Sequence, residues 1–168
     1  MRKEPANALM RSKPRYTAIL PRLSAALLCA AVLATPRPAH AALGAGVDSL
    51  VADQAILGGA DVVTPMTTYD LHEIKAASGT SVREYVSREG TVFAVSWGGP
   101  SHPNLQQLLG NSYAAYQAAA RVNRRGHHIV SINTPDLVAS VLRLQRTSSG
   151  QIYVPGLVPP GVAVASLR

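Results

Sequence analysis

The sequence predicts an α+β domain in which an antiparallel meander of about three strands is followed by one main helix and then by two or three further strands. Three observations lead to this prediction. β-rich runs separated by glycine turns lie between Thr67 and Trp97, leucines and tyrosines recur every three or four residues from Asn104, and β-rich runs return after Gly126. Strands, one helix and further strands in this order are typical of a sheet that a helix covers on one face.

The meander is predicted from three runs rich in β-branched and aromatic residues, "TTYDLHEIKA", "TSVREYVS" and "TVFAVSW". The turns between them contain Ser78-Gly79 and Arg88-Glu89-Gly90, and the second turn fits a three-residue loop with Gly90 in the left-handed region. Upstream, "VDSLVADQAIL" predicts a short helix that ends at Gly58-Gly59.

The main helix is predicted from Asn104 to about Arg121, and it should end before Gly126. Gly110 in its interior costs about 1 kcal/mol relative to alanine, so it either kinks the helix or admits close packing. The runs "HHIVSIN", "LVASVLRLQ" and "QIYV" then predict the later strands.

The first 41 residues have the pattern of a secretory signal peptide. Basic residues precede the apolar run Leu23 to Ala34, and "TPRPAHA" follows it, so cleavage is expected after Ala41. The apolar run has twelve residues, whereas a membrane-spanning helix needs about 20. The sequence therefore predicts a periplasmic or secreted protein with no transmembrane segment after processing. A single domain is expected over 42–155, and three prolines predict an extended tail over 156–168.

Processing would change the charge and the cysteine content. Residues 42–168 keep nine basic and eight acidic side chains, so their net charge is +1. The basic character of the whole chain therefore gives no support to nucleic-acid binding. The lone Cys29 lies in the apolar run, which leaves no thiol for a disulfide, a nucleophile or a metal site. No metal-binding, nucleophile-elbow or phosphate-loop motif is present, and no cofactor is expected.

One face of the predicted meander is a candidate binding surface. Pairing through the Gly90 turn sets Arg83 opposite Val95, and an even-numbered loop at Ser78-Gly79 adds His72 to the same face; an odd-numbered loop would reverse the first strand. A guanidinium near aromatic rings can bind a carboxylate, a phosphate or a sugar. The alternative is an ordinary sheet face on which Arg83 pairs with Asp70. The candidate residues are His72, Arg83, Tyr85 and Trp97.

Two further groups are candidates for chemistry. Glu73 and Glu84 are predicted as neighbours on the other face, where adjacent carboxyls could separate their pKa values and act as acid and base. The alternative is a solvated patch. A basic patch of Arg121, Arg124 and Arg125 follows the main helix, where cations are favoured by the helix dipole. Contact with an anionic envelope polymer or lipid headgroup is its functional alternative.

An ordered string of residues carries a family resemblance. It comprises Tyr69, His72-Glu73, "SGT", "VREYV", Gly90 to Val95, Trp97, Gly99-Pro100, Leu105, "LLG", Tyr113 and Tyr116. The chain resembles, over roughly residues 42 to 155, the proteobacterial family of exported proteins catalogued as domain of unknown function 2844. The resemblance implies an envelope or secreted protein of uncharacterised activity, and it supplies no catalytic residue.

Two functional hypotheses follow. The first is a non-catalytic binding or scaffolding module of the bacterial cell envelope, whose partner is an envelope protein, a polymer or a small anionic ligand. The second is an envelope hydrolase that uses the Glu73 and Glu84 pair. Exposed sheet edges also leave weak self-association open. The two hypotheses depend on which sheet face the helix covers.

Overall fold

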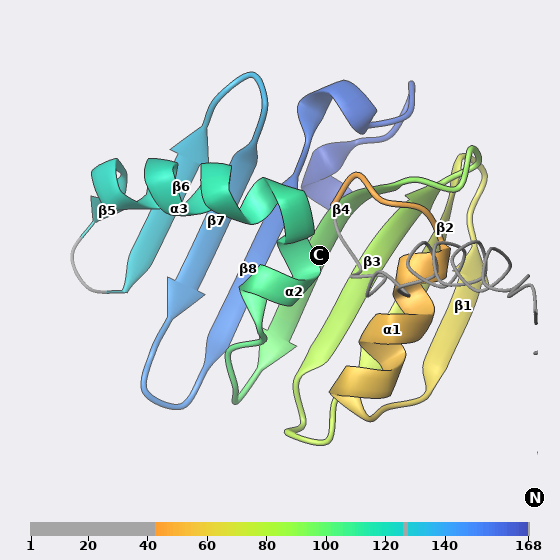
Figure 1. Cartoon of the computed structure of the whole chain (residues 1–168), viewed down its shortest axis with the longest axis horizontal. Helices are drawn as coiled ribbons and strands as arrows, with labels where there is room; N and C mark the ends of the chain where they lie inside the picture. Colours follow the sequence, from red (N-terminus) through yellow and green to blue (C-terminus); the bar gives the residue numbers. More distant parts are fainter. Residues whose placement is uncertain (1–42, 126–127, 168) are drawn as a thin grey trace, which may run out of the picture. The chain divides into compact units, whose positions relative to one another are not determined.

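The computed structural model describes residues 43–125 and 128–167, which form one antiparallel sheet with helices on one face (Figure 1). The predicted α+β class is confirmed, although the sheet has eight strands in the order β1-β2-β3-β4-β8-β7-β6-β5. The strands are β1 (Asp61–Pro65), β2 (Tyr69–Lys75), β3 (Ser81–Ser87), β4 (Val92–Gly99), β5 (Arg124–Arg125), β6 (Ile129–Asn133), β7 (Val138–Arg143) and β8 (Ser148–Tyr153). The helices are α1 (Asp48–Leu57), α2 (Leu105–Leu109) and α3 (Tyr113–Val122).

The strand order explains how the helices come to cover one face. Strands β1 to β4 form a meander, after which the chain passes over the sheet through α2 and α3 to the opposite edge. It then returns as a second meander, β5 to β8, and β8 pairs with β4 at the centre of the sheet. Figure 1 shows α1 in front of the first meander, and α2 and α3 in front of the second. We call this side the helix face and the other side the open face.

The edge strand β1 was not predicted. Its sequence, "DVVTP", ends in Pro65, and all of its residues after Asp61 are exposed. Exposure on both sides removes the alternation of apolar and polar residues by which a half-buried strand is recognised. A proline is tolerated here because an edge strand needs fewer backbone hydrogen bonds than a central one.

Gly110 interrupts the predicted main helix. Its backbone angles, φ 45° and ψ −117°, are strained for a residue with a side chain, and a 3-10 turn (Gly110–Ser112) follows it. The single helix expected from Asn104 to Arg121 is therefore two helices, α2 and α3. Asn104 begins α2, because its side-chain oxygen accepts hydrogen bonds from the backbone N–H groups of Gln106 and Gln107.

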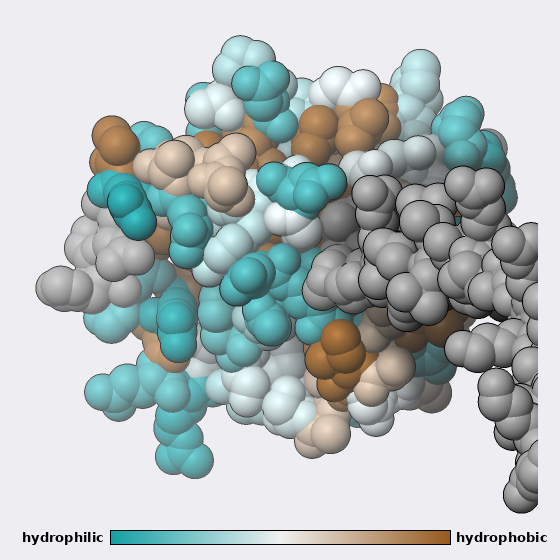
Figure 2. Space-filling model, viewed as in Figure 1, coloured by the Kyte–Doolittle hydropathy of each residue, from teal (hydrophilic) through white to brown (hydrophobic). Residues whose placement is uncertain are grey.

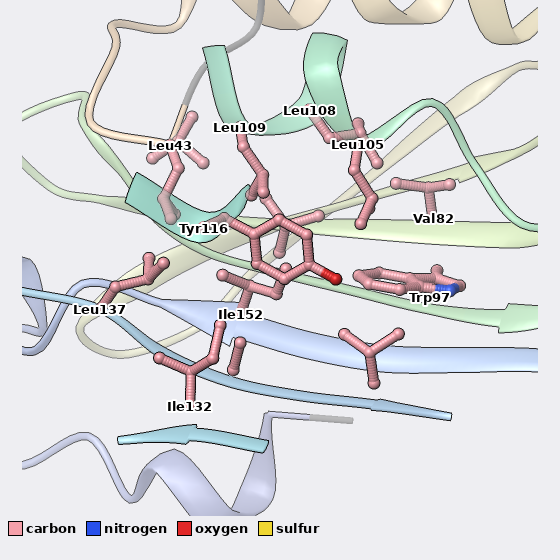
Figure 3. Close-up of a cluster of buried hydrophobic side chains, with 14 of the residues drawn as sticks. Leu43, Val82, Trp97, Leu105, Leu108, Leu109, Tyr116, Ile132, Leu137 and Ile152 are labelled. Carbon is pink, nitrogen blue, oxygen red and sulfur yellow. The ribbon is translucent and has the colours of Figure 1, made fainter. Parts of the chain in front are cut away.

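The main core lies between the helices and the sheet (Figure 3). Leu108 and Leu109 of α2 are almost fully buried, and they pack with Ile152 from β8. Each such side chain stabilises the fold by roughly 1.5–3 kcal/mol through burial. The core also includes Trp97 and Tyr116, which Figure 3 shows between α2 and the sheet.

A smaller core on the open face is covered by the C-terminal segment. Tyr85, Phe93 and Ala94 pack there with Leu167, which has no exposed surface. Instead of an extended tail, the described part of residues 156–168 contains 3-10 turns and packs against the sheet. Apolar valines within the segment drive this packing, although its prolines keep it irregular. No helix within the described residues is long and apolar enough to span a membrane.

The predicted pairing of β3 with β4 holds only next to the turn. Val86 pairs with Val92 as expected, but a β-bulge follows, and Tyr85 pairs with Ala94 instead of Phe93. The extra residue shifts the register by one, so Arg83 pairs with Ser96 and Val82 pairs with Trp97. Because successive side chains alternate between faces, this shift moves Val95 and Trp97 to the helix face.

The pairing of β2 with β3 also differs from the even-loop prediction. Lys75 pairs with Ser81, so five residues connect the two strands. An odd number of residues reverses the side assignment of β2, which was the alternative left open by the sequence. His72 therefore pairs with Glu84 on the helix face, and Glu73 pairs with Arg83 on the open face.

Candidate functional site

The predicted binding surface of His72, Arg83, Tyr85 and Trp97 is divided between the two faces. Arg83 and Tyr85 lie on the open face, whereas His72 and Trp97 lie on the helix face. Tyr85 and Trp97 are buried, with exposed fractions of 2% and 4%. The Tyr85 hydroxyl lies 3.2 Å from Ser96 Oγ, and burial raises its pKa. These four residues do not form one recognition surface, because the bulge and the odd loop separate them.

The predicted carboxylate pair is not formed either. Glu73 is on the open face, where both of its oxygens accept hydrogen bonds from Arg83 at 3.2 and 3.3 Å. Glu84 is on the helix face and is 1% exposed. Asp70, the expected alternative partner of Arg83, instead pairs with Arg88 at 2.9 Å. A hydrolase that uses Glu73 and Glu84 together has no geometric basis.

Glu84 belongs to a buried polar cluster that the sequence did not reveal. Asp53 of α1 has no exposed surface, and Gln107 of α2 donates a hydrogen bond to it at 2.5 Å. Burial raises the pKa of Glu84 to about 9, with further contributions from hydrogen bonding and charge at Asp53 and from charge at Asp61. Glu84 is therefore protonated at neutral pH. The cluster links α1, α2 and β3 beneath the helices.

A pocket of about 420 Å³ opens between the helical segment and the end of β7. Its polar and aromatic lining comes from the start of α2, from α3 and from β7. Figure 2 shows hydrophilic residues mixed with pale brown ones on this face where α3 passes over the strands. The lining residues that matter for ligand chemistry are His102, Tyr113, Tyr116, Gln117, Arg121 and Arg143.

The predicted basic patch contributes one residue to this pocket. Arg121 lies in the last turn of α3 and lines the pocket. Arg124 and Arg125 form the short strand β5, and their side chains lie outside the described residues. The second arginine of the pocket is Arg143, which stands at the end of β7 and was not part of the predicted patch.

His102 is held at the pocket by a hydrogen-bonded chain. Trp97 Nε1 donates to Ser148 Oγ at 3.0 Å, and His102 Nδ1 lies 2.8 Å from the same oxygen. The rings of Trp97 and His102 also meet edge to face, with centroids 5.6 Å apart. The Ser148 oxygen accepts from the indole, and its hydroxyl can either donate to His102 Nδ1 or accept from it, according to the tautomer of the ring.

The electrostatics of the pocket favour the neutral form of His102. Burial lowers the pKa of His102 below its usual value, and the positive charge of Arg143 lowers it further. His102 is thus neutral at pH 7. The charged groups of the lining are both guanidinium groups, and no carboxylate is among the described residues that line the pocket. Such a set of donors is complementary to an anion.

Two tyrosines give the pocket an aromatic wall. The rings of Tyr113 and Tyr116 are stacked, with centroids 6.3 Å apart and planes 21° apart. Gln117 donates to the Tyr113 hydroxyl at 3.0 Å, so this hydroxyl can donate onward to a ligand. The wall could therefore contact the apolar part of a ligand whose anionic group meets the arginines.

Ser148 is not placed to act as a nucleophile, although it is hydrogen-bonded to a histidine. It is 2% exposed, and the Trp97 indole covers it from β4. A nucleophile must reach a substrate carbon, which this packing prevents. Within the described residues, no group of three or more histidine, aspartate, glutamate or cysteine side chains is placed to hold a metal ion.

Fold and pocket together define a small α+β protein with a donor-lined pocket beneath its helices. The chain belongs to the family described as protein of unknown function (DUF2844), whose model matches residues 39–167. The resemblance found in the sequence is thereby confirmed, and the match extends through the packed C-terminal segment. No curated protein and no solved structure matches the chain significantly.

Proposed function

We propose that this protein is an exported, non-catalytic binding module of the bacterial cell envelope that holds a small anionic group in the pocket between α2, α3 and β7. The observation that carries the proposal is the composition of the lining. The guanidinium groups of Arg121 and Arg143 are donors, and no carboxylate is among the described residues that line the same space.

Export is supported by the sequence pattern of residues 1–41. The basic start, the twelve-residue apolar run and the small residues before position 42 are those of a cleaved secretory signal. The absence of cysteine after Ala41 suits a domain that folds by packing alone in an oxidising compartment. A periplasmic or secreted location follows from this pattern. Processing after Ala41 is tested by the N-terminal sequence of the protein recovered from its host's envelope fraction.

The expected affinity is modest. Hydrogen bonds to charged groups contribute about 1.5–3 kcal/mol each, but both arginines are exposed, and solvent and salt weaken their attraction. A free energy of about −4 to −8 kcal/mol corresponds to dissociation constants between about 1 mM and 1 μM. A carboxylate, sulfate or phosphate group on a sugar or on a small acid has the required chemistry.

The test is calorimetric titration of the processed protein with glucuronate and with sulfate. Arg143→Gln should weaken binding about tenfold, because one charge-assisted contact is lost. Arg146→Gln is the matched control, since Arg146 is exposed and does not line the pocket. Equal affinities in the two variants would show that the anion binds elsewhere. Turnover of ester, glycoside or phosphate substrates that one substitution abolishes would contradict the non-catalytic assignment.

Self-association through the β1 edge is a second candidate, because one specific feature favours it. Val62 and Val63 are 60% and 50% exposed, and within the described residues β1 pairs with β2 alone. An exposed apolar edge strand is a template for pairing with another chain. Light scattering across a concentration series tests this: a mass that rises with concentration in the wild type, but not in Val63→Lys, would support a scaffolding role.

A further inference from the structure

The open face carries an uninterrupted row of polar side chains across six strands. Each residue of the row is the direct partner of the next in the sheet register, from β6 at one end to β2 at the other. Directly paired residues of antiparallel strands point to the same face. The row consists of Ser131, Ser140, Gln151, Ser96, Arg83 and Glu73.

The row is long and regular. Neighbouring strands lie about 4.8 Å apart, so five intervals give a row of roughly 24 Å. Because the row crosses the strands, its polar groups are separated by the distance between neighbouring strands. A ligand that matched this spacing would be an extended chain of similar polar units.

A hollow of about 460 Å³ lies over the middle of the row. Four members of the row, Ser140, Gln151, Ser96 and Arg83, line it. Gly98 and Ser149, which pair with each other in the next row of the open face, also line the hollow. Because these residues are small, the floor of the hollow lies close to the backbone of the sheet. The hollow is therefore a shallow trough in the sheet surface.

Neighbouring groups fix the centre of the row. The Gln151 amide nitrogen donates to the backbone oxygen of Val164 in the C-terminal segment at 2.8 Å, which leaves the amide oxygen to accept from a ligand. Ser96 is held by the Tyr85 hydroxyl at 3.2 Å. Because these side chains are already oriented, binding would lose less conformational entropy.

The row on the open face and the pocket between α2, α3 and β7 differ in charge, so they should bind different classes of ligand. Arg83 and Glu73 neutralise each other through two hydrogen bonds, and the other members are uncharged. Serine hydroxyls can both donate and accept, and the glutamine oxygen accepts, so together they can pair with the hydroxyl groups of a sugar. An anion gains no net attraction here.

We propose that the polar row on the open face is a binding site for a linear, uncharged polysaccharide chain that lies across the six strands from β6 to β2. Ser131 and Ser140 contact it at one end, Gln151 contacts it in the trough, and the neutralised Arg83 and Glu73 pair contacts it at the other end. Ser96 lies buried in the floor of the trough. This site is independent of the anion pocket, because the two lie on opposite faces of the sheet.

The test follows backbone amide resonances of the processed protein during titration with two neutral chains, cellohexaose and maltohexaose, and with oligogalacturonate as a charged contrast. At least one neutral chain should perturb amides of β7, β8 and β4 in a saturable manner. No perturbation there by either neutral chain, or perturbation by the charged chain alone, would overturn the proposal.

Variants make the test site-specific. Ser131→Ala with Ser140→Ala removes two exposed hydroxyls of the row and should weaken binding about tenfold. Thr64→Val is the control, since it removes an exposed hydroxyl from the same face outside the row. Equal weakening in both variants would contradict the proposed position. Arg143→Gln separates the two sites: it should leave neutral-chain binding unchanged while anion binding falls.

Discussion

Ser148 Oγ lies 2.8 Å from His102 Nδ1, although the two residues are 46 positions apart in the chain. Trp97 Nε1 donates to the same oxygen at 3.0 Å. The Ser148 hydroxyl therefore ties the His102 ring, which lines the pocket, to the buried indole of Trp97.

Ser148→Ala should release His102 and destabilise the fold. The buried Trp97 N–H would lose its partner, which costs about 1–3 kcal/mol of unfolding free energy. The pKa of His102 should stay below its usual value, because burial and the charge of Arg143, which lower it, are both still present. Urea unfolding and an NMR titration of the histidine ring measure the two quantities. A variant as stable as the wild type would show that Ser148 does not satisfy the Trp97 N–H.

Anion binding should strengthen as the pH falls through the pKa of His102. Protonation adds a positive charge beside Arg121 and Arg143, and this charge attracts an anion. By linkage, the bound anion must raise the pKa of His102 in return. Sulfate is the suitable probe, since its own charge is constant over this range. Binding that is flat with pH across the His102 titration would place the anion away from this ring.

Glu84→Gln should change the pH dependence of stability. The pKa of Glu84 is about 9 in the folded chain, against 4.5 when unfolded, so between these values the folded state holds a proton that the unfolded state releases. The contribution of Glu84 is complete below pH 4.5, declines as the pH rises toward 9 and is constant above that. The loss is on the order of 1.4 kcal/mol per pH unit within this window.

The glutamine variant removes this slope, and it should be more stable than the wild type at pH 8. Denaturant unfolding at several pH values measures the difference. Glu89→Gln is the control, because Glu89 is a fully exposed carboxylate in the turn after β3. If Glu84→Gln and the wild type kept the same slope, burial of a protonated Glu84 would be disproved.

Gly150→Ala should displace the Trp97 ring. A β-carbon at position 150 would lie 2.3 Å from Trp97 Cζ2, which is far closer than two carbons can approach. Overpacking of this kind typically costs about 1–3 kcal/mol. Trp97 is the single tryptophan of the chain, so its fluorescence reports the change directly. Emission should shift to longer wavelength, whereas Gly156→Ala, which meets nothing within 4 Å, should leave it unchanged.

The elements that could be predicted were those that leave a pattern among residues close together in the sequence. Apolar periodicity located the α2 and α3 segment, and glycine turns located the strands β2 to β4, because both signals depend on neighbours in sequence. The bulge beside Phe93 left no local signal, and one extra residue moved Trp97 to the other face. The edge strand β1, exposed at every residue after Asp61, has no alternation to detect.

The candidate site depended on contacts between distant residues. Ser148 lies in a run that reads as a turn, and His102 stands alone in "SHPN" before α2. Only the central pairing of β4 with β8 brings Trp97 and Ser148 together. The same holds for Asp53 and Gln107, which are 54 positions apart. A single sequence could suggest Arg121 as part of a basic patch, but it could not place Arg143 beside it.

The central claim is that the pocket between α2, α3 and β7 binds an anion through its donor groups. The most direct measurement follows the His102 ring resonances of the processed protein while sulfate is added, in the wild type and in Arg143→Gln. We predict a saturable shift of the His102 ring in the wild type, with a half-point at much higher sulfate in the variant. A ring that does not respond to sulfate, or that responds equally in both proteins, would contradict the claim.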